Sequence, residues 1–293
     1  MKNLKLPAVC LSCLTMTGCS ALNFSVEGLI NAPKLTSEQS EIHQALIESV
    51  GSNITLKYPK NGEYRSAYVI ANIDDEPTDE AMVFYEYTSN GSEEDGLRVN
   101  ILDKDEDGKW YSVKELAGAG TDIDQVIISP MGSNNQTDVF VGYQNLTNDE
   151  KTMEIYSYTD GDFKRVALDT YSVLEPLDIN NDGYIELITI QRSTNNDTGA
   201  VTAKASMLNM KNNEITRGEN VDMCDNVTSY VSSKTGMLDS GRRAIFIDGL
   251  TADGKLQTEI IYYRYSGLQN PMQLRSEKLL PLCTRPAGYY SED

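Results

Sequence analysis

Apolar residues follow two different periods along this chain. Over residues 35–53 they recur at helical spacing, with Ile42, Leu46 and Val50 on one face. From residue 54 onward, short apolar or alternating runs are separated by clusters of Gly, Asn and Asp, a pattern typical of strands joined by turns. The sequence therefore predicts one short helix followed by many strands, beginning with ITLKYP, YRSAYVIAN, EAMVFYEY, LRVNILDK, KWYSVKEL and DQVIISP.

The predicted helix has recognisable signals at both ends. Thr36 and Gln39 have the spacing of a capping box, and Gly51 is a natural stop. His43, the only histidine of the chain, lies among Gln and Glu on this helix. We expect it to be a solvated surface residue, because a lone histidine without partners is a weak ligand or base.

A polar loop followed by an apolar strand recurs along the chain about every fifty residues. Segments 72–84, 130–142 and 235–247 align without gaps on segment 178–190, which places Glu80, Asp138 and Arg243 opposite Glu186. Tight hairpins recur with the same period, and their turn residues are Gly108, Gly161, Asn213 and Gly267. Two independent markers with one period indicate a repeat architecture.

A unit of about fifty residues with about four short strands is what a β-propeller blade requires. Runs such as AMVFY and AIFI are apolar at successive positions, as expected of sheets packed on both faces. A set of β-sandwich domains is the alternative, but it predicts about 100 residues per unit. We therefore predict a mainly β fold of about four four-stranded blades, in which Trp110 packs within a blade rather than against a sugar.

The end of the chain raises the question of ring closure. Strands at 54–58 and 65–71 are expected in addition to the four blades, and N-terminal strands of propellers usually complete the last blade. The final residue, Asp293, aligns with the start of another loop. The expectation is a truncated chain and an incomplete ring, whose exposed edges favour self-association. The rival expectation is a small ring that the N-terminal strands close unaided.

The segment DINNDGYIE, residues 178–186, has the oxygen-rich pattern of a calcium loop. Calcium takes six to eight oxygen ligands, and Gly183 permits the sharp turn that brings them together. Thr189 stands where an EF-hand has its glutamate, so the loop is not an EF-hand. The alternative is an ion-free Asx-type turn. The predicted ligands are the side chains of Asp178, Asn180, Asp182 and Glu186, with the carbonyl of Tyr184.

Two other acidic loops are weaker candidates for calcium. The loop at 72–80 keeps Asp74, Glu76 and Glu80 but has Pro77 at the glycine position. The segment DKDEDG at 103–108 has alternating aspartates, but no carboxylate follows at the ninth position. We interpret this second segment as a hairpin with a type I′ turn.

The N-terminus predicts export and a lipid anchor. Residues 1–18 combine two lysines, a short apolar stretch and small residues, which is typical of a signal peptide. The following MTGC resembles a lipobox, in which Cys19 carries the lipid, and residues 19–34 would be a tether. An ordinary secretory signal is the alternative. Either reading places the repeat domain, residues 54–293, outside the cytoplasm.

The quoted motifs resemble a known family. Asp-x-Asn-x-Asp-Gly-x-x-Glu followed by an apolar strand is similar to the FG-GAP/VCBS repeats of integrin α-type propellers, and TDVFVG at 137–142 is similar to the same strand. With the lipobox and the short helix, the chain resembles bacterial surface lipoproteins that carry such repeats. The resemblance covers roughly residues 60–293, although no Phe-Gly…Gly-Ala-Pro element is present. It implies a propeller with calcium in its loops and no particular partner.

Composition narrows the function further. The net charge of −19 disfavours nucleic acid and anionic lipid surfaces. No serine-hydrolase, phosphate-loop or metal-histidine motif is present, so no enzymatic activity is predicted.

Cys224 and Cys283 are about one blade apart, too far to form a disulfide, so two buried free thiols are expected. The predicted function is a lipid-anchored, calcium-stabilised, non-catalytic module that binds or assembles proteins. A glycan- or cell-wall-binding module and a hydrolase with a site across blades are the alternatives.

Overall fold

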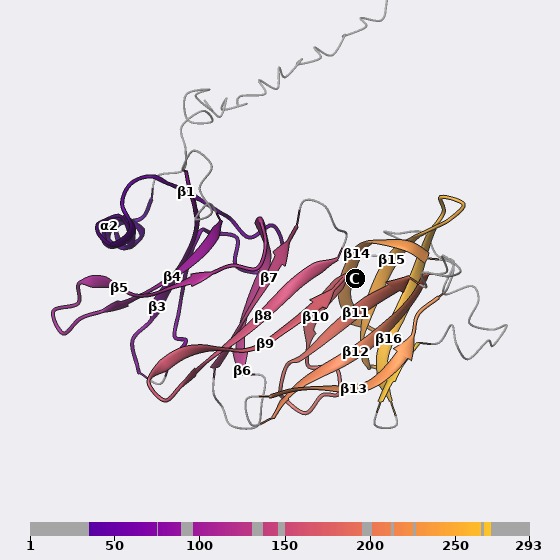
Figure 1. Ribbon diagram of the computed structural model, residues 1–293. Helices are drawn as coiled ribbons and strands as arrows, with labels where there is room; N and C mark the ends of the chain where they lie inside the picture. The colour runs from indigo at the N-terminus through magenta and orange to yellow at the C-terminus, as the bar shows by residue number, and fades with distance from the viewer. Residues whose placement is uncertain are drawn as a thin grey trace, which may run out of the picture.

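Within the residues that the structure describes, the protein is mainly β, with four antiparallel sheets preceded by one helix (Figure 1). This computed structural model describes residues 35–74, 76–88, 96–130, 137–145, 150–194, 201–211, 214–224, 227–264 and 267–270. The helix is α2 (Ser37–Val50). Within these residues, no helix combines the length and the apolar composition needed to cross a lipid bilayer.

Each sheet is built from strands that follow one another in the chain, and we call the four sheets blades 1 to 4. Blade 1 contains β1 (Ile54–Leu56), β2 (Tyr68–Ala71), β3 (Glu80–Tyr87), β4 (Leu97–Lys104) and β5 (Trp110–Ala117). Blade 2 contains β6 (Asp122–Pro130), β7 (Thr137–Gln144), β8 (Lys151–Thr159) and β9 (Asp162–Tyr171). Blade 3 contains β10 (Val173–Leu177), β11 (Glu186–Thr194), β12 (Val201–Lys211) and β13 (Glu214–Asp222). Blade 4 contains β14 (Val227–Met237), β15 (Arg243–Thr251), β16 (Leu256–Arg264) and β17 (Gly267–Gln269).

These four successive sheets confirm the predicted propeller-like architecture, with one correction at the N-terminus. The strands expected at 54–58 and 65–71 do not complete a last blade. They are β1 and β2, and they pair with opposite ends of β3, so together they form the interrupted first strand of blade 1. Residues 271–293 lie outside the described residues, so the expectation of a truncated ring stays a prediction.

Hydrophobic cores alternate with the sheets along the molecule. One core lies between α2 and blade 1, and three more lie between successive pairs of blades. The two faces of β3 show how this works, because Phe84 packs toward blade 2 whereas Val83 and Tyr85 pack toward the helix. Strands with buried residues on both faces therefore read as continuous apolar runs.

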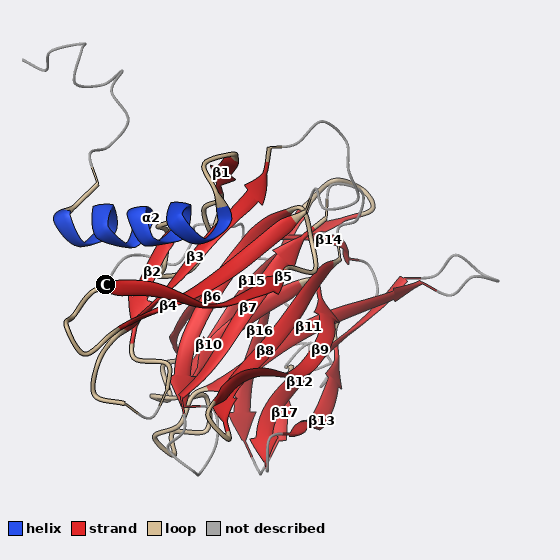
Figure 2. Cartoon of the chain, turned by 60° about the vertical axis from the view of Figure 1, so that its left-hand side comes forward, coloured by secondary structure: helices blue, strands red, loops and turns tan. Residues whose placement is uncertain are grey.

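Helix α2 covers the face of blade 1 that points away from blade 2 (Figure 2). The predicted capping box is present, since Thr36 Oγ1 accepts the Gln39 N–H at 3.1 Å and Gln39 Oε1 accepts the Thr36 N–H at 3.1 Å. Ile42 and Leu46 are fully buried, and Gly51 ends the helix with φ 83°. Trp110 is buried in the same core, which confirms its packing role.

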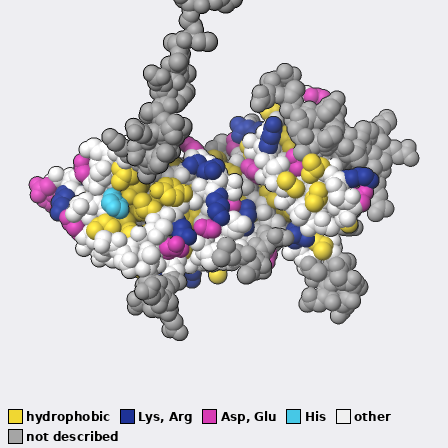
Figure 3. Space-filling model, turned by 90° about the horizontal axis from the view of Figure 1, so that it is seen from above, with side chains coloured by type: hydrophobic (Ala, Val, Ile, Leu, Met, Phe, Trp, Pro, Cys, Tyr) yellow, Lys and Arg dark blue, Asp and Glu magenta, His cyan; other side chains and the backbone are white. Residues whose placement is uncertain are grey.

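The prediction of a solvated His43 is wrong. The imidazole is half-buried, and its Nδ1 lies 2.8 Å from the hydroxyl of Tyr68 on β2. The two rings also meet edge to face. Seen from above, the histidine borders a patch of apolar side chains (Figure 3). The sequence of the helix alone could not show this contact, because the partner comes from the sheet beneath.

Both repeat markers occupy equivalent places in the blades. The aligned loops all join the first and second strands, and the hairpins at Gly108 and Gly161 join the third and fourth strands. Asn213 lies outside the described residues, and Gly267 is the first residue of β17, paired with Arg264, rather than a turn residue. The turn at Gly108 is not type I′, because φ is positive at Gly108 but not at Asp107. It is a type I turn followed by a glycine, closed by the Gly108 N–H on Asp105 O. The Asp160–Gly161 turn has positive φ at both residues, as type I′ requires.

The ungapped alignment of blade 4 is wrong by one residue. Ile188 of β11 packs toward blade 4, whereas the residue aligned with it, Ile245 of β15, packs toward blade 3. A shift of one residue reverses the face of every side chain in a strand. The shorter loop before β15 accounts for the shift, so Arg243 does not take the place of Glu186.

Candidate functional site

The predicted calcium ligands of the loop at 178–186 are close together, although Asp178 already has partners. Its carboxylate accepts the N–H groups of Asp182 at 3.0 Å and Gly183 at 3.2 Å. The guanidinium of Arg243, from blade 4, lies 2.8 Å from Asp178 Oδ2 and also donates to the Asp178 carbonyl. The positive charge that this aspartate requires is therefore supplied in part by the neighbouring blade.

The other side chains of this loop converge on the Asn180 amide. Asn180 Nδ2 donates to Asp182 Oδ2 at 2.9 Å and to Glu186 Oε1 at 2.8 Å. Asn180 Oδ1 accepts the Asp182 N–H, and the Tyr184 N–H donates to Asp182 Oδ1. Two carboxylates thus share one donor at a single point. A rotation of the Asn180 amide by half a turn would place its Oδ1 beside the carboxylate oxygens of Asp182 and Glu186.

Glu186 and Glu80 occupy the same place in blades 3 and 1. Each begins the second strand, is nearly fully buried, and accepts a backbone N–H from the loop, Ile179 at 3.0 Å and Ile73 at 2.8 Å. Burial raises the pKa of each carboxyl to about 7, and nearby aspartates add to the shift. Both glutamates therefore lack a full counter-charge where they lie.

The loop at 72–80 contains an acceptor without a donor. Glu80 Oε1 is buried and has no hydrogen-bond partner among the described residues. Asp74 lies near enough to raise the pKa of Glu80, and its Oδ1 accepts the Glu76 N–H at 2.7 Å. Glu76 takes part through its backbone, since its carbonyl also accepts from the Asn72 amide. A buried carboxylate oxygen in this state fits a cation.

The donor sets of both loops fit calcium, which prefers carboxylate, amide and carbonyl oxygens. No three Asp, Glu, His or Cys side chains within the described ranges already converge in a metal-binding arrangement, so binding requires local adjustment such as the Asn180 turn. In the hairpin at 103–108, Asp105 Oδ1 accepts the N–H groups of Asp107 and Lys109, so this carboxylate is used within its own turn. Cys19 and Cys283 lie outside the described residues. Cys224 is half-buried rather than buried as predicted.

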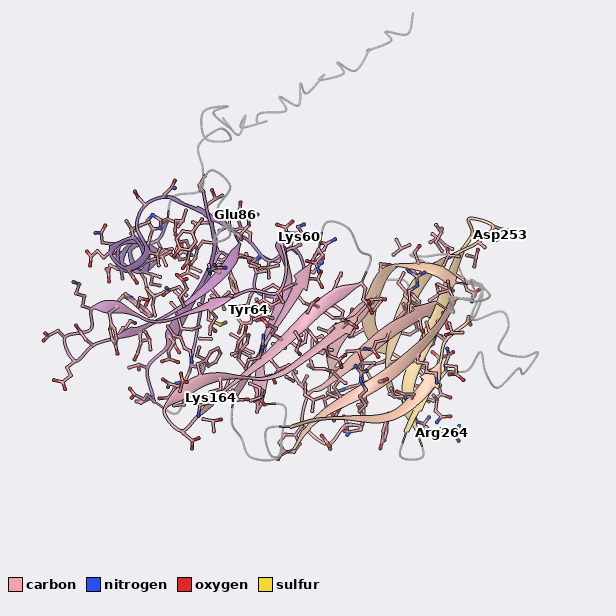
Figure 4. The ribbon with its side chains drawn as sticks, viewed as in Figure 1. Lys60, Tyr64, Glu86, Lys164, Asp253 and Arg264 are labelled. Carbon is pink, nitrogen blue, oxygen red and sulfur yellow. The ribbon has the colours of Figure 1, made fainter. Side chains whose placement is uncertain are left out.

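A second candidate site is a pocket of about 550 Å³ where the first strands of blades 2, 3 and 4 approach one another. We call it the axial pocket. Its fourth wall is residues 61–64. They belong to the segment 57–64, which leaves blade 1 and reaches the free edge of β6, where the Asn61 N–H donates to Asp124 O at 2.7 Å. Figure 4 labels Lys60 and Tyr64 on this segment, between the strands of blade 1 and those of blade 2.

Asp124 is the best-satisfied charged group of the axial pocket. It lies at an irregularity in the pairing of β6 with β7 and is 1% exposed. Its carboxylate accepts from Asn61 Nδ2 at 2.8 Å, from Lys151 Nζ at 2.8 Å and from the Tyr171 hydroxyl at 2.6 Å. Burial and the adjacent Asp124 raise the pKa of Tyr171 well above its usual value, so the phenol keeps its proton and donates.

Glu175 projects from β10 at the same pocket and is in a different state. The hydroxyl of Ser233, on β14 of the next blade, donates to Glu175 Oε1. No ion pair to Glu175 is formed within the described part of the chain. Burial raises the pKa of the Glu175 carboxyl above its ordinary value.

Sequence reasoning did not identify the axial pocket, although the repeat contained a signal. By strand register, Val69 and Ile127 are the equivalents of Glu175 in blades 1 and 2. By the same register Asp124 stands where blades 1 and 3 have serine. Carboxylates at positions where the other blades have valine, isoleucine or serine therefore mark the pocket, but they are recognisable only once the strands are aligned.

No family model and no curated protein matches this sequence. Among solved structures, the chain is similar to two proteins described as candidate 6-phosphogluconolactonases. For the one from Bacteroides fragilis, identity is 10%, the alignment covers 76% of this chain and 67% of that chain, and the TM-score is 0.33. For the one from Bacteroides uniformis, identity is 13%, the alignment covers 74% of this chain and 80% of that chain, and the TM-score is 0.30. A candidate exo-β-1,3-galactanase from Bifidobacterium bifidum is 12% identical, with 71% of each chain covered and a TM-score of 0.27. Since these TM-scores are low, the description of the fold rests on the four sheets themselves.

Proposed function

We propose that this chain is a lipid-anchored, extracytoplasmic binding or assembly module, built as a non-catalytic propeller of the FG-GAP/VCBS type. The sequence of residues 1–19 supports export and acylation of Cys19. The partner is a protein in the cell envelope, held by the axial face of the blades. Neither nucleic acid nor an anionic surface suits a chain of net charge −19.

The observation that carries this proposal is the axial pocket and its rim. Segments of three blades meet there with residues 61–64, so the surface exists only in the assembled fold. The rim includes Val231 of β14, an apolar side chain that is 62% exposed. A rigid scaffold that gathers edges and loops from several blades suits recognition, since each segment can vary without disturbing the cores.

Calcium is the proposed structural cofactor of this module. Asp182, Asn180 and Glu186 would hold it in blade 3, with Asp178 and the Tyr184 carbonyl, and Asp74, Glu76 and Glu80 would do so in blade 1. The ion supplies the positive charge that offsets repulsion among these carboxylates. The buried and unpartnered Glu80 Oε1 supports the blade 1 loop in particular.

The test compares capture of envelope proteins by matched surface variants. Val231→Asp places a charge on the axial rim, whereas Val113→Asp places one on β5, where the side chain is also exposed. We expect the first variant to capture a stoichiometric partner at least about tenfold less well than the natural chain, because a charge buried at an interface costs affinity. The second variant should capture it normally. Equal capture by both variants, or turnover in a glycosidase and esterase screen, contradicts the proposal.

The anchor is tested separately, at the mature N-terminus. Mass spectrometry should find an acylated Cys19 as the first residue. An unmodified N-terminus at another position contradicts the proposed anchor, whatever the result of the capture experiment.

A further inference from the structure

Glu175 departs from its own repeat at a position that the other blades use for packing. Val69 and Ile127 hold the equivalent register positions in blades 1 and 2, and they are only 2% and 8% exposed. Each of these side chains packs toward the next blade at the inner edge of the sheet. A carboxylate in the third copy therefore replaces apolar packing and calls for another explanation.

The surroundings of Glu175 leave its charge uncompensated. One hydroxyl, that of Ser233, donates to Oε1, whereas a carboxylate can accept about four hydrogen bonds. The one ammonium group of the pocket lining, Lys151 Nζ, lies 2.8 Å from Asp124. The described lining therefore has three carboxylates, of Glu63, Asp124 and Glu175, against a single lysine. Glu175 is the member of this set that is both half-buried and without a cation.

We propose that the axial pocket binds a small ligand carrying a protonated amine beside hydroxyl groups, an amino sugar or amino alcohol, and that Glu175 and Ser233 receive it. The ammonium group lies against the Glu175 carboxylate and supplies the positive charge that the described pocket lining does not provide there. Lys151 has donors beyond the one used by Asp124, and these serve ligand hydroxyls together with Ser172 and Ser232. A volume of about 550 Å³ suits a ligand of this size. This role goes beyond the proposed protein-binding function and does not depend on it.

The first test is calorimetric titration of the full-length chain with three sugars at about pH 6, where an amine is protonated. D-Glucosamine should bind at one site, and D-glucose and N-acetyl-D-glucosamine at least about tenfold more weakly, because neither offers a cation to Glu175. Glu175→Gln should weaken glucosamine binding at least about tenfold. Glu106→Gln changes an exposed carboxylate of the β4–β5 hairpin, outside this lining, and should change glucosamine binding no more than about twofold. Equal binding of the three sugars, no binding of any, or unchanged binding by Glu175→Gln overturns the proposal.

The second test distinguishes a binding role from a structural one. Glu175→Val restores the residue type of blades 1 and 2, so without ligand it should raise the melting temperature by a few degrees. The same variant should lose glucosamine binding. A lower melting temperature would show that the carboxylate is needed for the fold itself, and the proposal would then fail.

Discussion

Gly142, on β7, makes room for the ring of Tyr171. A Cβ at this position would overlap the Tyr171 hydroxyl, which is the group that donates to Asp124. Tyr171 is fully buried and cannot move aside into solvent. One missing methyl group in blade 2 therefore permits the hydrogen-bond network at the axial pocket.

We expect Gly142→Ala to lower the free energy of unfolding by about 1–3 kcal/mol, since overpacking a closed core forces side chains out of place. The matched control is Gly96→Ala, where the nearest atom is the flexible tip of Arg98 at 3.1 Å. The control should change stability by no more than about 0.5 kcal/mol. Urea denaturation measures both, and equal effects would refute the packing argument.

Glu80 and Glu186 give a dependence of stability on pH whose sign follows from their raised pKa values of about 7. Below the ordinary pKa of 4.5 both carboxyls are protonated in the folded and unfolded chain, and neither opposes folding. As the pH rises from there to about 7, the unfolded chain releases these protons first, so stability falls.

The measurement is the melting temperature in chelator at about pH 5 and about pH 7.5. Compared with the natural chain, the double variant Glu80→Gln/Glu186→Gln should be relatively more stable at the higher pH. Parallel melting curves for the two proteins would show that these carboxyls do not titrate as described.

At the scale of elements, the strands were predictable because each is a short run between turn residues. The capping box, the repeat and the places of the loops all follow from local spacing. The pairing of both N-terminal strands, β1 and β2, with β3 did not, because it depends on where residues 57–64 find a partner. The shift in blade 4 was also hidden, since the face of a strand is fixed by packing against its neighbour.

The candidate sites divide in the same way. The ligands proposed for calcium lie within nine consecutive residues, so one loop is enough to bring them together. Glu175 and Ser233 are 58 residues apart and meet only because blades 3 and 4 stack. No local pattern encodes such a contact.

The two acidic loops give a test of calcium binding at this scale. Because the ion binds the folded chain, excess calcium should raise the melting temperature, by an amount that corresponds to about 2.7 kcal/mol at 100 times Kd. Asp182→Ala should remove most of the gain attributed to blade 3. Asp105→Ala should leave it intact, because that carboxylate serves only its own turn. A melting temperature that is the same in calcium and in chelator would defeat the proposal.

At the scale of the whole molecule, ion pairs between described residues join each blade to the next. Lys114 of blade 1 contacts Asp162 of blade 2, Arg217 of blade 3 contacts Asp169 of blade 2, and Arg243 of blade 4 contacts Asp178 of blade 3. These contacts lie at the edges of the apolar cores. Asp178, in the third pair, is itself a predicted calcium ligand. The stacking of blades 3 and 4 is therefore linked to the proposed calcium site.

Arg243→Gln should therefore have two opposite effects. Without calcium it should lower the free energy of unfolding by up to about 1 kcal/mol, as expected for a partly exposed ion pair. It should also raise calcium affinity, because the guanidinium no longer competes for Asp178 Oδ2. Calorimetric titration with calcium decides the second effect, and an affinity that falls or stays the same would count against competition.

The crossing of residues 57–64 to blade 2 has a consequence for biosynthesis. Asn61 finds its partner, Asp124, 63 positions later in the chain. A nascent chain emerges N-terminus first, so residues 57–64 are synthesised before β6. They therefore have no partner strand in blade 2 while β3 and β4 pair beside them. Blade 1 therefore gains these contacts only after blade 2 has been synthesised, and a nascent chain that ends before β6 lacks them.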